Sequence, residues 1–305
     1  MALRESAAWQ DLSSRGKIRV TGEDRARLLH AMTTNQVERL KPGEGCYVFF
    51  LNAQGRILGD ANLFCFEDSL LLDTEPETRV KLQEHLDRYI IADDVTLTDE
   101  TEATATIAVE GPTAASVLSL FGPDLPENRY SWTSWGARIV ANADTTGAGG
   151  FLILLPASGK DDLISQLASA NVIKATPEDG RIVRIERGRP RYGDEITERY
   201  LVQETAQTHA VSFNKGCYLG QEIVERVRSR AQIHRVLRRL ELDTAEIPAA
   251  GTKLSAAGNP AAEIASAAFS PALEKTVALA YVRTPYAEPG TQLDLDGTRA
   301  IVEDV

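Results

Sequence analysis

Strand-like and helix-like stretches alternate in a regular order through residues 1–230. Apolar or alternating runs at 46–51, 56–66 and 69–73 are separated only by short turns, and a helical pattern follows at 75–90. Short turns join antiparallel strands, whereas parallel strands need a crossover of about a dozen residues or more. The order therefore predicts an α+β body of two interleaved subdomains with antiparallel sheets, rather than a doubly wound parallel sheet.

The pattern changes at His234. From there to the end, short apolar runs are separated by glycine, proline and asparagine, and no stretch has the spacing of a helix. Closely spaced short strands with turn residues between them are typical of a sandwich or barrel. We therefore expect a body over residues 1–230 and a C-terminal all-β barrel over residues 234–305.

Composition and charge exclude several classes of protein. The 305 residues carry a formal net charge of −11, which argues against direct partners such as nucleic acid or an anionic membrane surface. No run approaches the roughly 18 apolar residues of a membrane span. The three cysteines form no disulfide or metal-binding spacing, and the four histidines are scattered. The sequence thus predicts a cytoplasmic protein without a metal site.

The strand expected at 56–66 has one face of mixed chemistry. Side chains alternate along a strand, so Asp60 and Asn62 share a face with Leu58, Phe64 and Phe66. Small-molecule sites are mostly apolar with a few placed polar groups, and this face fits that description. A solvated strand face is the alternative.

A loop at residues 214–222 carries a cysteine between two glycines. Gly216 and Gly220 bracket Cys217, and a helical pattern follows directly. A helix N-terminus and the basic neighbour Lys215 would both lower the pKa of the Cys217 thiol and make it nucleophilic. The alternative is a buried, inert cysteine in a packed turn.

This loop also resembles a family signature. Its run Lys-Gly-Cys-Tyr-x-Gly-Gln-Glu is similar to that of the YgfZ-type folate-binding proteins, which are relatives of the glycine-cleavage T-protein, an aminomethyltransferase. Further segments resemble the same group in the same order along the chain. They are residues 33–37, 51–60, 184–193, 201–205 and the barrel strands.

The resemblance implies a tetrahydrofolate site. A pterin presents two neighbouring N–H donors, which one carboxylate can accept together, and Glu204 matches the family's pterin-binding glutamate. Asp60 matches the aspartate that assists proton movement near folate N5 in the T-protein. Tyr218 of the motif and Arg228, for the anionic tail, complete the expected folate contacts, with Cys217 at the rim of the same cavity.

The resemblance leaves three functions open. The first is a tetrahydrofolate-binding protein that supports iron–sulfur cluster assembly or repair and, through its iron–sulfur client proteins, tRNA modification. The second is an aminomethyltransferase of glycine cleavage. The third is a non-catalytic folate-binding scaffold. The sequence does not decide whether a reaction is catalysed.

Overall fold

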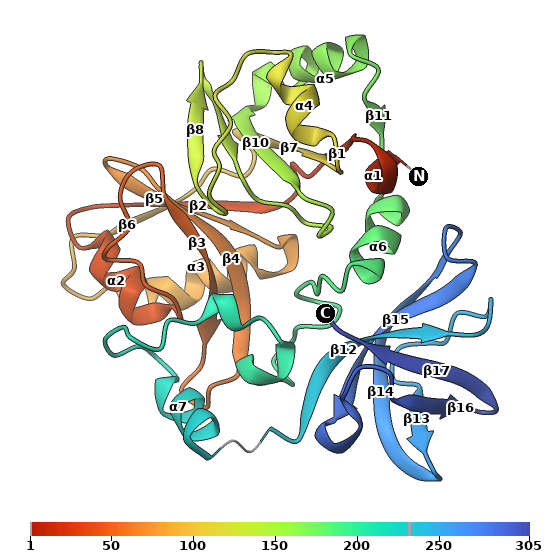
Figure 1. The fold of residues 1–305 in the computed structure, drawn as a ribbon. Coiled ribbons are helices and arrows are strands. Elements are labelled where there is room, and N and C mark those ends of the chain that lie inside the picture. The colour runs from red at the N-terminus through yellow and green to blue at the C-terminus, as the bar shows by residue number, and fades with distance from the viewer. Residues whose placement is uncertain (1, 231–232) are drawn as a thin grey trace.

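The computed structural model describes residues 2–230 and 233–305, and it contains two β-sheets and a closed barrel (Figure 1). The predicted fold class, an α+β body with a C-terminal all-β barrel, is confirmed. The two sheets lie beside each other in the body, and the barrel lies below them in Figure 1. Within the described residues, no helix is long and apolar enough to cross a membrane.

The first sheet has five antiparallel strands in the order β3-β4-β5-β2-β6. Helices α2 and α3 pack on its outer face through leucines such as Leu29 and Leu82. The elements are β2 (Gly16–Thr21), α2 (Arg25–Met32), β3 (Gly45–Leu51), β4 (Ile57–Cys65), β5 (Ser69–Thr74), α3 (Arg79–Asp87) and β6 (Thr96–Asp99).

The second sheet has six strands in the order β11-β1-β7-β10-β9-β8. Its strand β1 comes from the start of the chain, ahead of the whole first sheet, so the chain enters the second sheet before it forms the first. Only the pair β1–β11 is parallel. The elements are β1 (Ala8–Asp11), β7 (Thr104–Glu110), α4 (Ala114–Ser119), β8 (Trp132–Trp135), β9 (Arg138–Ala141), β10 (Gly150–Pro156), α5 (Lys160–Ser169) and β11 (Ile173–Lys174).

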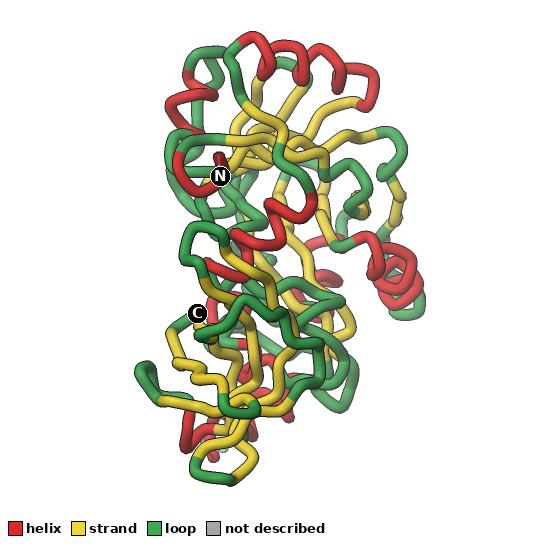
Figure 2. Tube along the Cα trace, turned by 90° about the vertical axis from the view of Figure 1, so that its right-hand side faces the viewer, coloured by secondary structure: helices red, strands yellow, loops and turns green. Residues whose placement is uncertain are grey.

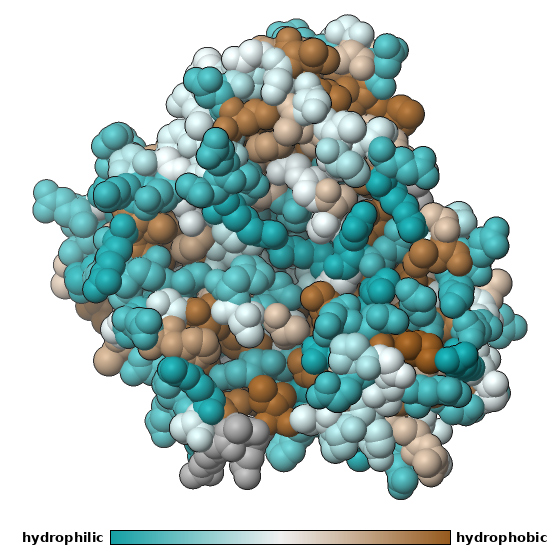
Figure 3. All heavy atoms as spheres, viewed as in Figure 1, coloured by the Kyte–Doolittle hydropathy of each residue, from teal (hydrophilic) through white to brown (hydrophobic). Residues whose placement is uncertain are grey.

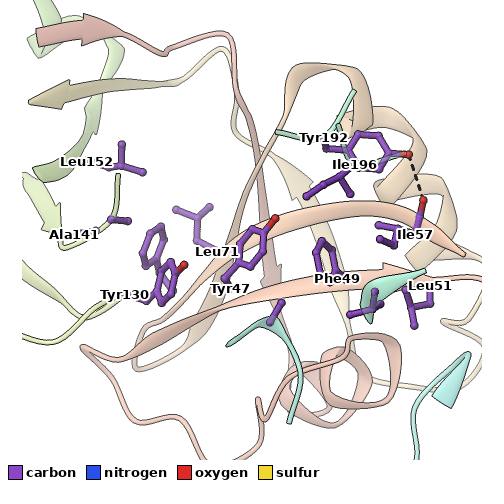
Figure 4. Packing of buried hydrophobic residues seen from close by; sticks show 14 of the residues in the cluster. Tyr47, Phe49, Leu51, Ile57, Leu71, Tyr130, Ala141, Leu152, Tyr192 and Ile196 are labelled. Atoms are coloured by element: carbon purple, nitrogen blue, oxygen red, sulfur yellow. Dashed lines mark hydrogen bonds between the residues drawn. The ribbon is translucent and has the colours of Figure 1, made fainter. Parts of the chain in front are cut away.

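The inner faces of the two sheets pack against each other, and helices cover both outer faces. The alternation of side chains along the strands produces this division. On β3, Val48 and Phe50 face α2 and α3, whereas Tyr47 and Phe49 face the second sheet. Figure 4 shows Tyr47 and Leu71 of the first sheet opposite Leu152 of the second.

The alternation expected for the strand at 56–66 holds from Gly59 to Cys65 but is wrong at its start. Ile57 belongs to the cluster between the sheets, and Leu58 packs towards the helices. The cause is a β-bulge, because Phe50 pairs with Gly59 and the next residue, Leu51, pairs with Ile57. A bulge inserts one unpaired residue and exchanges the two faces.

Helix α6 (Pro177–Glu186) connects the body to the barrel. It begins with a capping box, in which Thr176 and Asp179 exchange hydrogen bonds. The N-terminal helix α1 (Ala2–Glu5) packs on it through Leu3 and Val183. The C-terminal Val305 lies against Gly188 just beyond it, so both chain ends contact this region, on one side of the molecule (Figure 2).

A long irregular segment and α7 (Gln221–Arg230) follow, and the barrel then closes in the order β12-β15-β14-β13-β16-β17. Ile185 of α6 packs with Leu237 and Tyr281 of the barrel, which fixes the barrel against the body. The strands are β12 (Arg235–Leu242), β13 (Lys253–Ala256), β14 (Asn259–Ser270), β15 (Lys275–Arg283), β16 (Gln292–Leu295) and β17 (Thr298–Glu303).

Candidate functional site

A cavity of about 310 Å³ lies where the two sheets and α6 meet. This volume is at the lower end of the roughly 300–1,000 Å³ of small-molecule sites. Its wall combines the first sheet, the segment after β9, α6 and the loop after α6. The lining residues are Gln10, Leu12, Ser14, Arg15, Tyr47, Asp60, Ala61, Asn62, Glu75, Pro76, Asp144, Thr145, Thr146, Pro177, Gly180, Arg181, Arg184, Arg189, Pro190, Arg191 and Asp194.

Asp60 supplies a buried carboxylate to this cavity. It lies in the middle of β4, and among the described residues only the Tyr47 hydroxyl hydrogen-bonds to its carboxylate, at 2.6 Å from Oδ2. Burial, followed by the charge of Glu75, raises the pKa of Asp60 to about 6. A carboxylate with this pKa can take and return a proton near neutral pH.

One aromatic ring, that of Tyr47, lines the cavity beside Asp60, and the rings of two further residues pack against it. Tyr47 faces Tyr130 at a centroid distance of 6.4 Å and His209 at 5.4 Å. The Tyr130 hydroxyl and His209 Nε2 are 3.2 Å apart. Figure 4 shows Tyr47 and Tyr130 next to each other between the sheets. A flat apolar face beside a carboxylate suits a planar heterocycle.

Asn62 lies two residues after Asp60 on the same face, as the alternation predicts. Both side chains are buried and both line the cavity. Asn62 Nδ2 donates to Asp73 Oδ2 at 2.9 Å. The mixed face of this strand therefore lines a cavity and is not a solvated surface.

Glu204 lies elsewhere, outside the lining of the cavity. It belongs to a short 3₁₀ helix (Val202–Thr205). Its Oε2 accepts a hydrogen bond from the backbone N–H of Leu201, and its Oε1 accepts one from Arg235 Nε, both at 2.9 Å. The structure thus does not bring Glu204 and Asp60 to one cavity wall, in contrast to the sequence-based expectation. The reason is Arg235, at the start of β12, which takes the Glu204 carboxylate.

The Cys217 thiol is exposed, in contrast to the inert, buried alternative. Its loop packs on the turn between β3 and β4 through two glycines with positive φ. A Cβ on Gly220 would lie 2.6 Å from the Asn52 carbonyl oxygen, and one on Gly55 would lie 2.7 Å from Ile223 Cβ. Side chains at these positions would clash and strain the backbone. The glycines thus fix Cys217 next to the hairpin that carries Asp60, but Cys217 does not line the cavity.

Lys215 anchors this loop. Its Nζ donates to the carbonyl oxygens of His30, Thr33 and Asn35 at 2.5, 2.6 and 2.8 Å. Three acceptors use all three donors of the ammonium, so none remains for Cys217. Burial lowers the pKa of Lys215 to about 8, which leaves it mostly protonated at neutral pH.

Tyr218 and Arg228 also lie outside the cavity lining. Tyr218 is buried in the core cluster that contains Tyr47, where burial raises its pKa to about 12. Among the described residues its hydroxyl has no hydrogen-bond partner. Arg228 is exposed, pairs with Glu225 at 3.4 Å and lies over the Phe213 ring at 4.5 Å. Of the predicted site residues, only Asp60 therefore lines the cavity.

Sequence reasoning missed two cavity residues, Tyr47 and Arg189. Tyr47 pairs with Asn62 across β3 and β4, so it lies diagonally from Asp60 on the same face, within reach of a long side chain. Pairing the two strands around their turn would have found it. Arg189 follows α6, and no local pattern places it near β4. Within the described residues, no group of three or more histidine, cysteine or acidic side chains is arranged to hold a metal ion.

Comparison with known families identifies the class of this fold and site. The family described as the GCVT N-terminal domain matches residues 1–215. The family described as the glycine cleavage T-protein C-terminal barrel domain matches residues 235–301. The chain therefore belongs to the glycine cleavage T-protein family.

Individual relatives agree with this assignment. An aminomethyltransferase from Streptomyces coelicolor is 29% identical and covers 100% of this chain and 87% of its own length. A putative chloroplastic transferase from Arabidopsis thaliana is 30% identical to this chain. The matched region covers 84% of this chain and 60% of the length of that relative. The crystal structure of aminomethyltransferase T from Bartonella henselae has the same fold, with a TM-score of 0.89, 23% identity and coverage of 99% and 86%.

Proposed function

We propose that this protein binds tetrahydrofolate in the cavity beside Asp60 and transfers a one-carbon unit to it, and relatives named aminomethyltransferase support a transfer reaction of this kind. The observation that carries the proposal is the buried Asp60, with a pKa of about 6 and one hydrogen-bond partner, Tyr47. A group of this kind is suited to proton transfer at neutral pH. The YgfZ-type resemblance of the cysteine loop is a finer distinction and supports a second candidate function.

The residues present fit a reduced pterin. The Asp60 carboxylate accepts one hydrogen bond at Oδ2, from Tyr47, and keeps its other oxygen for a ligand N–H. Asn62 donates to Asp73 and keeps an amide oxygen, which is a second acceptor on the same strand face. The Tyr47 ring adds a flat apolar surface. Acceptors beside an aromatic face match the N–H donors and the plane of a pterin.

Within the proposal, Asp60 moves a proton. Bound tetrahydrofolate supplies the nucleophilic nitrogen that receives the one-carbon unit. Asp60, ionised for the most part above pH 6, accepts a proton from the bound ligand, and the Tyr47 hydroxyl holds the carboxylate in position.

The test is a transfer assay with an aminomethyl-lipoyl carrier protein, in which release of ammonia depends on tetrahydrofolate. We expect activity for the wild type and a loss of about 100-fold or more for Asp60→Asn, in line with general acid–base catalysis. Asp68→Asn, which removes the same charge from the exposed turn between β4 and β5, is the matched control. Tetrahydrofolate binding without any transfer would instead favour the non-catalytic scaffold.

A second candidate function rests on the exposed Cys217. It is support of iron–sulfur cluster assembly or repair and, through iron–sulfur client proteins, of tRNA modification. One thiol does not hold a cluster, which usually needs about four, so Cys217 would act as an accessible nucleophile. Cells carrying only the Cys217→Ser protein should then lose activity of a dependent iron–sulfur enzyme, while transfer in the carrier assay is unchanged. Full iron–sulfur activity in such cells would remove this candidate.

A further inference from the structure

Arg189 differs from the other arginines of the cavity wall in its ion pairing, because each of the others has a carboxylate partner. Arg15 contacts Asp73 at 2.9 Å, and Arg184 contacts Glu195 at 2.6 Å. Arg191 contacts Glu75 at 3.0 Å and Glu77 at 2.6 Å. Arg181 contacts Glu178 at 3.6 Å, so these four side chains are neutralised by the protein itself.

Among the described residues, no carboxylate lies within 4.0 Å of the Arg189 guanidinium. The guanidinium lies over the Tyr47 ring, 5.7 Å from its centroid. Burial opposes its charge, but Tyr130, Tyr47 and Asp144 outweigh this effect and raise the pKa of Arg189. It is thus a permanent cation at a partly buried position, which is costly without an anion.

Asp60 and Arg189 meet at the same ring. Asp60 accepts the hydrogen bond of the Tyr47 hydroxyl, and Arg189 covers the face of the Tyr47 ring. The cavity therefore presents, at the two ends of one tyrosine contact, a carboxylate with a free oxygen and a cation that has no carboxylate within 4.0 Å among the described residues. A ligand that satisfies both carries N–H donors at one end and an anionic group further along.

We propose that Arg189 is an anion-binding subsite of this cavity, and that it takes a carboxylate of the glutamate tail when tetrahydrofolate is bound. The proposal rests on the proposed function. A guanidinium can donate two parallel hydrogen bonds to a carboxylate, and Arg189 lines the cavity in which such a carboxylate would lie. Arg228, the arginine expected from the sequence, has an exposed position and a Glu225 partner instead.

The test compares two ligands by calorimetric titration under anaerobic conditions, tetrahydrofolate and 6-methyltetrahydropterin, which lacks the anionic tail. We expect Arg189→Gln to weaken tetrahydrofolate about 10- to 100-fold, as for the loss of a charge-assisted hydrogen-bond pair, and to weaken 6-methyltetrahydropterin less than about 3-fold.

Arg129→Gln is the matched control. Arg129 lies over the Tyr130 ring at 5.2 Å, much as Arg189 lies over Tyr47, but it has Asp144 at 3.7 Å and does not line the cavity. We expect less than about 3-fold change with either ligand for this variant. If Arg189→Gln does not fold, the same two ligands are compared with Arg189→Lys. This variant keeps the positive charge but loses the planar guanidinium, which can donate two parallel hydrogen bonds.

The outcomes separate this subsite from the proposed function. Three results would overturn the subsite while folate binding stands. They are an equal loss of affinity for both ligands in Arg189→Gln, no loss of affinity for either ligand, or the same loss of affinity in Arg129→Gln. Wild-type protein that binds neither ligand would overturn the proposed function, and the subsite with it. A selective loss of tetrahydrofolate affinity supports the subsite.

Discussion

The Tyr47 hydroxyl donates a 2.6 Å hydrogen bond to Asp60 Oδ2, from the strand next to the one that carries Asp60. This bond favours the ionised carboxylate, whereas burial and Glu75 oppose it, and the balance gives Asp60 a pKa of about 6. Arg15 and Arg189 also favour ionisation. The proton affinity of Asp60 therefore depends on residues from both strands and from the loop after α6.

Tyr47→Phe should raise the pKa of Asp60 further, because it removes a donor to the ionised form. The rising limb of the pH–rate profile for transfer should move upward by roughly half to one pH unit, and the ring packing should remain. The measurement is kcat/KM from pH 5 to pH 8. An unchanged profile would mean that this hydrogen bond does not set the pKa that matters for the reaction.

Asp60→Asn should remove a pH-dependent cost of folding. The pKa of Asp60 rises from its ordinary 3.8 to about 6 in the folded protein, so the native state binds the proton more tightly than the unfolded chain does. Ionisation therefore lowers the free energy of unfolding as pH rises from about 4 to about 6, by at most about 3 kcal/mol. Asp60→Asn should be more stable than wild type at pH 8 and similar to it at pH 4.

Urea denaturation at several pH values measures this difference. Asp68→Asn, at the exposed turn of the same hairpin, should follow the wild-type curve. Parallel curves for wild type and Asp60→Asn across this range would contradict the raised pKa.

Lys215→Met should destabilise the protein by roughly 2–4 kcal/mol, because three backbone carbonyls lose a charged donor. The neighbouring Cys217→Ser, on an exposed side chain, should change stability by less than about 0.5 kcal/mol. Both values come from urea denaturation at pH 7. A Lys215 variant as stable as Cys217→Ser would show that the three contacts do not hold the loop.

Glu204→Ala should lower stability by about 1–2 kcal/mol, since it removes the partner of Arg235 and of the Leu201 amide. Arg235→Met should have a similar cost. If Glu204 acts only in this way, the tetrahydrofolate affinity of the folded protein should change by less than about 3-fold in both variants. A large loss of affinity confined to Glu204→Ala would instead support the pterin-binding role expected from the sequence.

Local patterns predicted the parts of this protein that depend on neighbours in sequence. The period of two along β4 placed Asp60 and Asn62 on one face, and that face lines the cavity, except where a bulge exchanged Ile57 and Leu58. A capping threonine and a proline at the first helical position are local signals of a helix start, and α6 begins at such a pair, Thr176 and Pro177. Apolar residues reach the surface only in separate groups on the face seen in Figure 3, which agrees with the ordinary composition.

The remainder depended on contacts between distant segments. Glu204 matched a family position, but its partner Arg235 comes from the barrel, 31 positions later. Arg189 could not be distinguished from Arg184 or Arg191 by sequence, because the difference lies in which carboxylates the fold brings to each. Lys215 was expected to act on Cys217, and it binds carbonyl groups in the last turn of α2 and just beyond it instead.

The binding of tetrahydrofolate beside Asp60 is the central claim, and calorimetric titration of wild type, Asp60→Asn and Asp68→Asn with tetrahydrofolate at pH 7.5 tests it most directly. We expect saturable one-to-one binding by wild type and Asp68→Asn, and a loss of about 10-fold or more in affinity for Asp60→Asn. Equal affinity for all three proteins, or no binding by any of them, would contradict it.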